Sequence, residues 1–168
     1  MRDRIVGPAG LDNPIGFPTD TGLTIASLIT GGVIERYPQL RMAFSHGGGT
    51  FPFFLPRLQH AWSGAWNDEP PNPARQAPSA LREILPKPPS EYARTLYYDT
   101  LLFDGRAIRY LCEMMGSSQL IVGTDYPFVP RELPVGKTLR SLGFGDDDVE
   151  AITWRNCLRF LGVEAPSS

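Results

Sequence analysis

The sequence has few of the residues that mark a secreted or metal-rich protein. It contains two cysteines, Cys112 and Cys157, which lie far apart and outside any CxxC pair, and two histidines, His46 and His60. Neither a disulfide framework nor a zinc knuckle is therefore indicated. A reducing cytoplasm is the compartment that this cysteine usage favours.

Long runs of like charge and long apolar segments are also missing. The 16 Lys and Arg and 18 Asp and Glu residues give a net charge of -2 and are spread along the chain. No basic surface for nucleic acid or an anionic membrane is therefore indicated. No apolar segment is long enough to cross a bilayer, and the first ten residues lack the apolar stretch of a signal peptide. A cytoplasmic protein with a small-molecule ligand is expected.

Glycine and proline, at 17 residues each, are plentiful. Much of the proline falls in residues 67–90, which we interpret as a long exposed connection with one helical turn around residues 79–85. The rest of the chain is regularly punctuated, and its hydrophobic content of 42% suffices for one ordinary core. A single domain over residues 1–168 is expected.

Hydrophobic spacing predicts helices that alternate with short apolar strands, the first of which is expected to be buried and to end at His46. The first helix contains the pair Gly31 and Gly32, each of which costs about 1 kcal/mol relative to alanine unless a close neighbour needs the room. Pro56 lies inside the second helix, and Asp104 caps the third. The predicted helices cover residues 21–37, 52–66, 104–116 and 146–162, and the predicted strands cover residues 40–46, 95–102 and 119–125.

This alternation is typical of parallel βα units. Polar residues follow or end the predicted strands: His46 after the first, Asp99 and Thr100 in the second, and Asp125 after the third. In a (β/α) barrel this edge of the sheet carries the active site. A complete barrel takes roughly 250 residues, and only three strands are recognisable here, so we expect part of a barrel.

Other familiar motifs are incomplete. The triplet Gly136 to Thr138 lacks the glycine that a phosphate loop needs five positions earlier, where Arg131 stands. The acids of residues 146–148 are consecutive, without the alternating spacing of a calcium loop, and they are interpreted as a solvated helix start. No GxSxG motif occurs, and both cysteines lie in predicted helices where burial is expected.

The residues alone leave the roles of the polar candidates open. His46 precedes three glycines, which would let a ligand approach closely but also make ordinary tight turns. Asp125 directly follows an apolar strand, where a carboxylate needs a cation, a metal or several hydrogen-bond donors. Alternatively, Asp125 caps the next turn. Arg57 and His60 fit ordinary surface positions on a helix.

Two motifs in order, "SHGGGTFPFFLPR" and "VGTDYPF", with "YYDTLLFD" between them, resemble the amidohydrolase-2 family of metal-dependent enzymes from about Ile15 to Val163. The resemblance implies the carboxy-terminal part of a (β/α)8 TIM barrel, about strands 6 to 8, with a divalent metal, usually zinc, at its mouth. It implies that Asp125 ligates the metal and that His46 is the acid/base. It also implies that Arg57 reaches a substrate carboxylate in a neighbouring subunit, and hence a homodimer or other homo-oligomer.

The sequence also departs from the family pattern. The HxH or ExH pair of the first strand and a histidine of the fifth have no counterpart among its two histidines. A zinc site takes about three protein ligands, so the chain alone is expected to bind metal poorly and to be nearly inactive, as a truncated form.

The function expected from the resemblance is a metal-dependent, non-oxidative decarboxylase of an unsaturated or aromatic carboxylic acid, without an organic cofactor. The same family also allows a hydrolase or hydratase. A third reading is an inactive half-barrel that serves as an association module.

Overall fold

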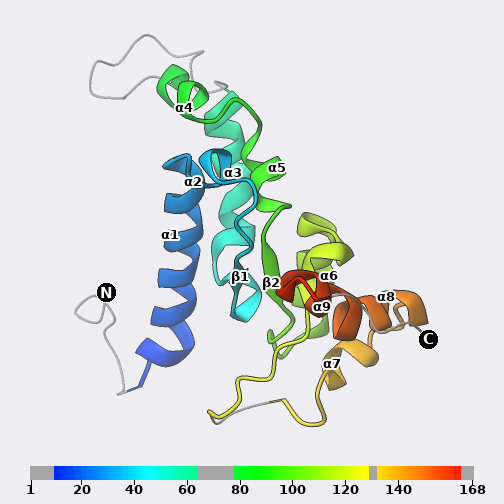
Figure 1. Cartoon of the computed structure of the whole chain (residues 1–168). Coiled ribbons are helices and arrows are strands. Elements are labelled where there is room, and N and C mark those ends of the chain that lie inside the picture. Colours follow the sequence, from blue (N-terminus) through cyan, green and yellow to red (C-terminus); the bar gives the residue numbers. More distant parts are fainter. Residues whose placement is uncertain (1–9, 64–77, 129–131, 164–168) are drawn as a thin grey trace. The chain divides into compact units, whose positions relative to one another are not determined.

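The computed structural model describes residues 10–63, 78–128 and 132–163 (Figure 1). They form two compact units, one built from residues 10–40 and 50–93 and the other from residues 41–49 and 94–163, within the described ranges. Residues 67–77 of the predicted connection lie outside the described residues. None of the helices in these ranges has the length and apolarity needed to cross a membrane.

The first unit is helical. A π-helical turn, Asp12–Gly16, leads into α1 (Phe17–Thr30), and α2 (Val33–Arg36) follows after two glycines. The single helix predicted over residues 21–37 is therefore wrong in its extent. Gly32 breaks it with a left-handed φ of 68°, and a Cβ there would lie 3.0 Å from a side-chain carbon of Ile84. The glycine pair is thus a turn that gives room to a neighbouring segment.

Helix α3 (Phe51–Ser63) confirms the second predicted helix as far as Ser63 and includes Pro56. Helix α1 packs against its start at Gly22, where a Cβ would lie 2.9 Å from the backbone nitrogen of Phe51. The buried side chains Ile25, Ile29, Phe51 and Leu55 belong to this core.

Two short helices complete the first unit. Helix α4 (Pro78–Ile84) confirms the predicted helical turn, and α5 (Pro89–Ala93) follows it. The Tyr92 hydroxyl donates a 2.8 Å hydrogen bond to Glu35 of α2, so α5 is joined to α2 through a polar contact.

The second unit contains a parallel three-stranded sheet in the order β1-β2-β3. Its strands are β1 (Ala43–Phe44), β2 (Tyr97–Asp99) and β3 (Leu120–Ile121), shorter than the predicted segments but at the predicted places. The first strand was predicted to be buried, and this is wrong: Ala43 is exposed and Phe44 half-buried. The reason is that β1 lies at an edge of the described sheet, whereas Tyr97 and Tyr98 of the central strand β2 are buried.

Helices follow the second and third strands. Helix α6 (Gly105–Met115) begins as predicted, since the Asp104 carboxylate accepts a 2.8 Å hydrogen bond from the backbone of Arg106. The paired Arg106 side chain lowers the pKa of Asp104 to about 2. After β3 come α7 (Lys137–Arg140), α8 (Asp146–Glu150), a π-helical stretch (Ala151–Arg155) and α9 (Asn156–Leu161).

The cysteines lie in α6 and α9, as expected. The expected burial is wrong, because Cys112 and Cys157 are free thiols of intermediate exposure. The acids of residues 146–148 begin α8, as predicted.

Candidate functional site

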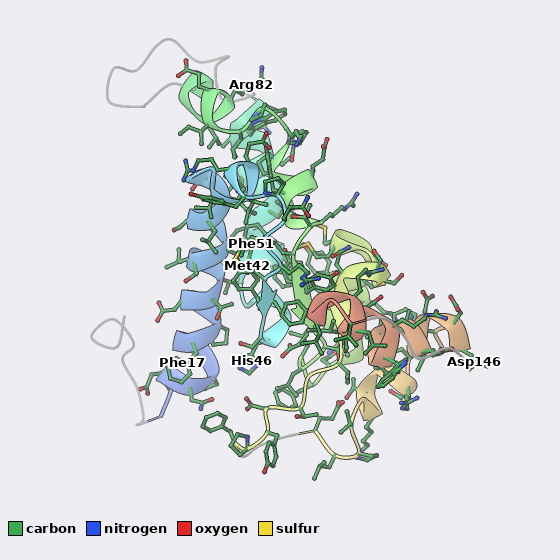
Figure 2. All side chains as sticks on the ribbon, in the orientation of Figure 1. Phe17, Met42, His46, Phe51, Arg82 and Asp146 are labelled. Atoms are coloured by element: carbon green, nitrogen blue, oxygen red, sulfur yellow. The ribbon has the colours of Figure 1, made fainter. Side chains whose placement is uncertain are left out.

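The carboxyl ends of the three parallel strands lie along one edge of the sheet. His46 follows the last residue of β1 by two positions, Asp99 ends β2, and Asp125 follows the last residue of β3 by four. Figure 2 labels His46 just beyond the end of β1. The fold therefore brings an imidazole and two carboxylates to the same edge.

Backbone strain also gathers at this edge. His46, Phe103 and Asp125 have φ values of 54°, 56° and 64°, and they are the non-glycine residues of the described chain with positive φ. Each follows a different strand of the sheet. A left-handed conformation costs about 1–2 kcal/mol for a residue with a side chain, and such strain concentrates at functional sites.

The turn after β1 shows why three glycines follow the histidine. Residues His46, Gly47, Gly48 and Gly49 have φ values of 54°, 61°, 77° and 62°, so four successive residues are left-handed. Gly47 and Gly48 are buried, and a Cβ at Gly47 would lie 2.9 Å from a methyl carbon of Leu102. Both the handedness and the space at this turn therefore require glycine.

Asp99 connects the three loops of this edge. Its Oδ1 accepts hydrogen bonds from the backbone N–H groups of Gly47 and Leu101, each at 3.1 Å. A Cβ on Gly123, in the loop after β3, would lie 2.5 Å from its Oδ2. Burial raises the pKa of Asp99, and the N–H donors and the charge of His46 oppose this rise only in part. The sequence placed Asp99 among the polar candidates but gave it no role, although an acid in the apolar run "YYDT" is the signal that marks it.

The structure places the predicted site residues as follows. His46 and Asp125 are half-exposed at the shared edge, so both side chains are accessible to a ligand there. Arg57 belongs to the other unit, on α3, and is exposed, as is His60 on the same helix.

A metal centre is incomplete within the described residues. Nowhere in residues 10–63, 78–128 and 132–163 do three or more His, Cys, Asp or Glu side chains gather so that they could hold a metal ion. Asp125 is a single candidate ligand, and a zinc site takes about three protein ligands. The described residues therefore do not fit a self-sufficient metal site.

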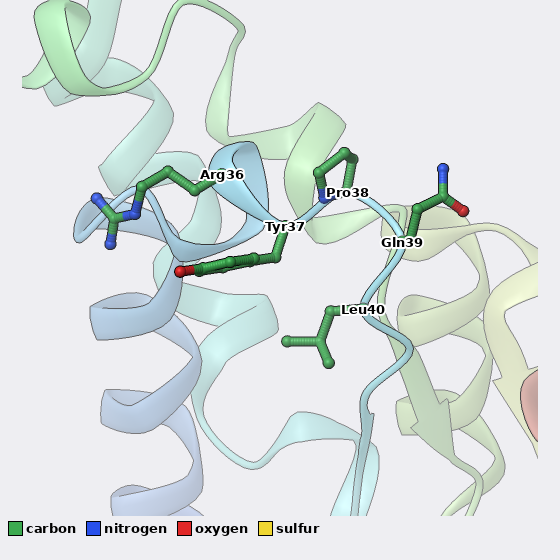
Figure 3. Close-up of a pocket in the computed structure, with 5 residues that line it drawn as sticks. All are labelled: Arg36, Tyr37, Pro38, Gln39 and Leu40. Carbon is green, nitrogen blue, oxygen red and sulfur yellow. The ribbon is translucent and has the colours of Figure 1, made fainter.

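A surface hollow in the first unit is lined by Arg36, Tyr37, Pro38, Gln39 and Leu40 (Figure 3). None of the predicted site residues lines it, and it contains no acid, histidine or cysteine.

Alternating strands and helices, with polar and strained loops at the carboxyl edge of a parallel sheet, define the class of (β/α)-barrel enzymes. The chain belongs to the amidohydrolase family, whose sequence model matches residues 6–163. This match confirms the family expected from the paired motifs.

The chain is similar to named decarboxylases. It is 34% identical over 151 residues to 2-amino-3-carboxymuconate-6-semialdehyde decarboxylase of Dictyostelium discoideum, with 89% of this chain and 39% of the relative covered. The chain is likewise 30% identical over 151 residues to the enzyme of the same name from Caenorhabditis elegans, with 89% of this chain and 35% of the relative covered.

Solved structures show the same fold. The structure of 5-carboxyvanillate decarboxylase from Sphingomonas paucimobilis matches with a TM-score of 0.67 and 23% identity, over 89% of this chain and 42% of that one. A dihydroxybenzoic acid decarboxylase from Polaromonas, with bound manganese and an inhibitor, matches with a TM-score of 0.68 and 19% identity, over 88% of this chain and 41% of that one.

The chain thus spans about two fifths of the length of the relatives it matches. Its architecture is part of the amidohydrolase-type (β/α)8 barrel, as predicted.

Proposed function

We propose that the chain forms the carboxy-terminal part of a non-oxidative decarboxylase that acts on an unsaturated or aromatic carboxylic acid. The observation that carries this proposal is the shared strand edge, where His46 and Asp125 follow parallel strands in strained conformations. Its support from outside the chain is that the relatives bear the names of decarboxylases of such acids.

His46 is the proposed acid/base of the reaction. In a decarboxylation the bond between a substrate carbon and its carboxylate breaks, carbon dioxide leaves, and the electron pair stays on the conjugated carbon skeleton. A proton then replaces the lost group on that carbon. An imidazole is suited to deliver it because it exchanges protons near neutral pH.

Asp125 and Arg57 are proposed to bind. Asp125 would contribute one carboxylate ligand to a divalent metal, zinc by expectation, in a barrel whose other ligands come from outside the described residues. Arg57 would orient a substrate carboxylate through its planar fork in the site of a neighbouring subunit, which makes the protein a homodimer or larger homo-oligomer. The sparse, unpaired cysteines support a cytoplasmic location.

Release of carbon dioxide tests the proposal. The chain, and any longer polypeptide that contains it, would be incubated with hydroxybenzoic and muconic acids, with and without added Zn²⁺ or Mn²⁺. We expect little turnover by the chain alone and metal-dependent release by a polypeptide with a complete barrel. His46→Asn should lower that rate by about 100-fold or more, whereas the matched control His60→Asn, on the exposed face of α3, should leave it unchanged.

The same assay separates the alternatives. Hydrolysis of lactones or amides without release of carbon dioxide would favour a hydrolase of the same family. No turnover of any of these compounds by the complete barrel would favour an association module.

A further inference from the structure

We infer that Asp99 is a positioning residue, whose half-buried carboxylate holds the loops after β1 and β3 in the conformations that direct His46 and Asp125 to one site. The roles of these two residues rest on the proposed function, whereas the contacts made by Asp99 do not.

The first contact is to the loop that carries His46. The Gly47 N–H, directly after the imidazole-bearing residue, donates to Asp99 Oδ1 at 3.1 Å across 52 positions of sequence. The left-handed φ of 54° at His46 is costly for a residue with a side chain. A hydrogen bond to the next peptide group opposes relaxation of that conformation, so Asp99 fixes the direction in which the imidazole leaves the backbone.

The second contact is to the loop that carries Asp125. Gly123 packs so closely on Asp99 that a Cβ on it would lie 2.5 Å from Oδ2, 2.7 Å from Cγ and 2.8 Å from Cβ of the acid. The residue of the loop after β3 that contacts Asp99 must therefore be glycine. Two residues later Asp125 is left-handed, with a φ of 64°. The close contact between Gly123 and Asp99 therefore helps to fix the backbone position from which the Asp125 side chain extends.

The third contact makes Asp99 rigid. Its Oδ1 also accepts the Leu101 N–H at 3.1 Å, within its own loop. An acid partly withdrawn from water is costly unless its oxygens accept hydrogen bonds, and bonds to a carboxylate are stronger than those to a neutral acceptor. Burial raises the pKa of Asp99 while the N–H donors oppose the rise, as expected for an acid that is held in place at some cost.

Nuclear magnetic resonance of the chain itself tests the inference. Amide exchange at Gly47 and Leu101 and the ring signals of His46 would be followed in wild type, Asp99→Ala and Asp99→Asn. The chain has only two histidines, so His60 is an internal control. Asp104→Asn is the matched charge control, because asparagine caps a helix as well as aspartate does.

In Asp99→Ala we expect the Gly47 amide to exchange at least ten-fold faster and the His46 ring signals to move, while those of His60 stay. Asp99→Asn keeps an acceptor oxygen but loses the charge, so it should show a smaller change in the same direction. Asp104→Asn should show neither change. If Gly47 exchange and the His46 signals are the same in both Asp99 variants as in wild type, the inference is wrong. If Asp99→Ala does not fold, the result for Asp99→Asn decides.

Kinetics separate positioning from general support of the fold. In a polypeptide with decarboxylase activity, Asp99→Ala should lower kcat at least ten-fold with KM changed by less than about three-fold, and Asp99→Asn should restore part of kcat. If kcat/KM falls equally in Asp99→Ala and Asp99→Asn because KM rises while kcat stays the same, positioning is contradicted. If no polypeptide containing the chain releases carbon dioxide, the proposed function fails, and the magnetic resonance result still decides the role of Asp99.

Discussion

Burial and hydrogen bonding shift the pKa of individual side chains of this protein in opposite directions. Burial raises the pKa of Asp99 at the strand edge and that of the Tyr98 hydroxyl beside it in β2. The exposed Asp104 shows the opposite behaviour, because hydrogen bonds from Arg106 hold its pKa at about 2. Partial burial thus makes Asp99 harder to ionise than an aspartate in water.

Cys112 provides a test of this effect at one residue. Partial burial raises the pKa of its thiol above the ordinary value of 9.0, and the carboxylates of Asp148 and Glu113 raise it further. Because the thiolate is the reactive form, a raised pKa leaves less of it at pH 8. In a Cys157→Ser background we expect iodoacetamide to modify Cys112 several-fold more slowly in the folded chain than in urea.

The dependence of this rate on pH distinguishes ionisation from access. The midpoint should lie above pH 9 in the folded chain and should fall when Asp148 is replaced by asparagine, since one of the repelling charges is then removed. Equal midpoints in the folded chain and in urea would contradict the prediction.

The order of helices and strands could be predicted from the sequence because hydrophobic period and caps are local signals. Helix α6 begins after Asp104 and ends before Gly116 as predicted, since both signals lie within one turn of the helix. The division at Gly31 and Gly32 and the exposure of Ala43 could not be predicted with the same accuracy. They depend on which distant segment lies opposite, and a hydrophobic pattern does not contain that information.

The candidate site was predictable in the same unequal way. His46 and Asp125 stood out because they follow apolar runs, and the family motifs give them roles that stay predictions. The role of Asp99 could not be foreseen, because it depends on two peptide groups and a glycine from three different loops. The sequence shows that Asp99 is an acid within an apolar strand, but it does not show which residues contact Asp99.

The contact between α1 and α3 yields a prediction at the scale of the element. Alanine in place of Gly22 would gain about 1 kcal/mol of helix propensity, but its methyl group would meet Thr50 and the backbone of Phe51. Overpacking costs about 1–3 kcal/mol. We therefore expect Gly22→Ala to lower the free energy of unfolding, measured by urea denaturation.

Thr24→Ala is the matched control, because Thr24 is an exposed residue of the same helix. It should raise the free energy of unfolding by a few tenths of a kcal/mol through helix propensity alone. A gain in stability for Gly22→Ala as well would show that the close contact with Thr50 does not form.

Considered as a whole molecule, the chain leaves much apolar surface in contact with water. Phe17, Phe53 and Phe128 are 52%, 68% and 67% exposed, and Tyr126 is 76% exposed. The described sheet has two outer strands, each paired on one side only. Such surfaces and edges are where other chains bind.

We therefore expect the chain to self-associate. Sedimentation velocity should show an average mass that rises with concentration from 18.6 kDa toward twice that value. If Phe17 contributes to the contact, Phe17→Ser should weaken association about ten-fold or more, given the free energy of burying an aromatic side chain. Asp20→Ser, an exposed change on the same helix, should have no such effect. A monomer at every concentration would contradict the prediction.

The turn that begins at His46 has a consequence for how this protein can vary. Amino acids of natural proteins have the L configuration, which disfavours positive φ in residues with a side chain. At this turn four successive residues have positive φ. Glycine alone has no handedness, so replacing any of the three glycines introduces a side chain that the positive φ disfavours. Exposed helix positions accept most side chains with little strain, whereas this turn keeps its backbone conformation at low cost only with glycine at residues 47–49.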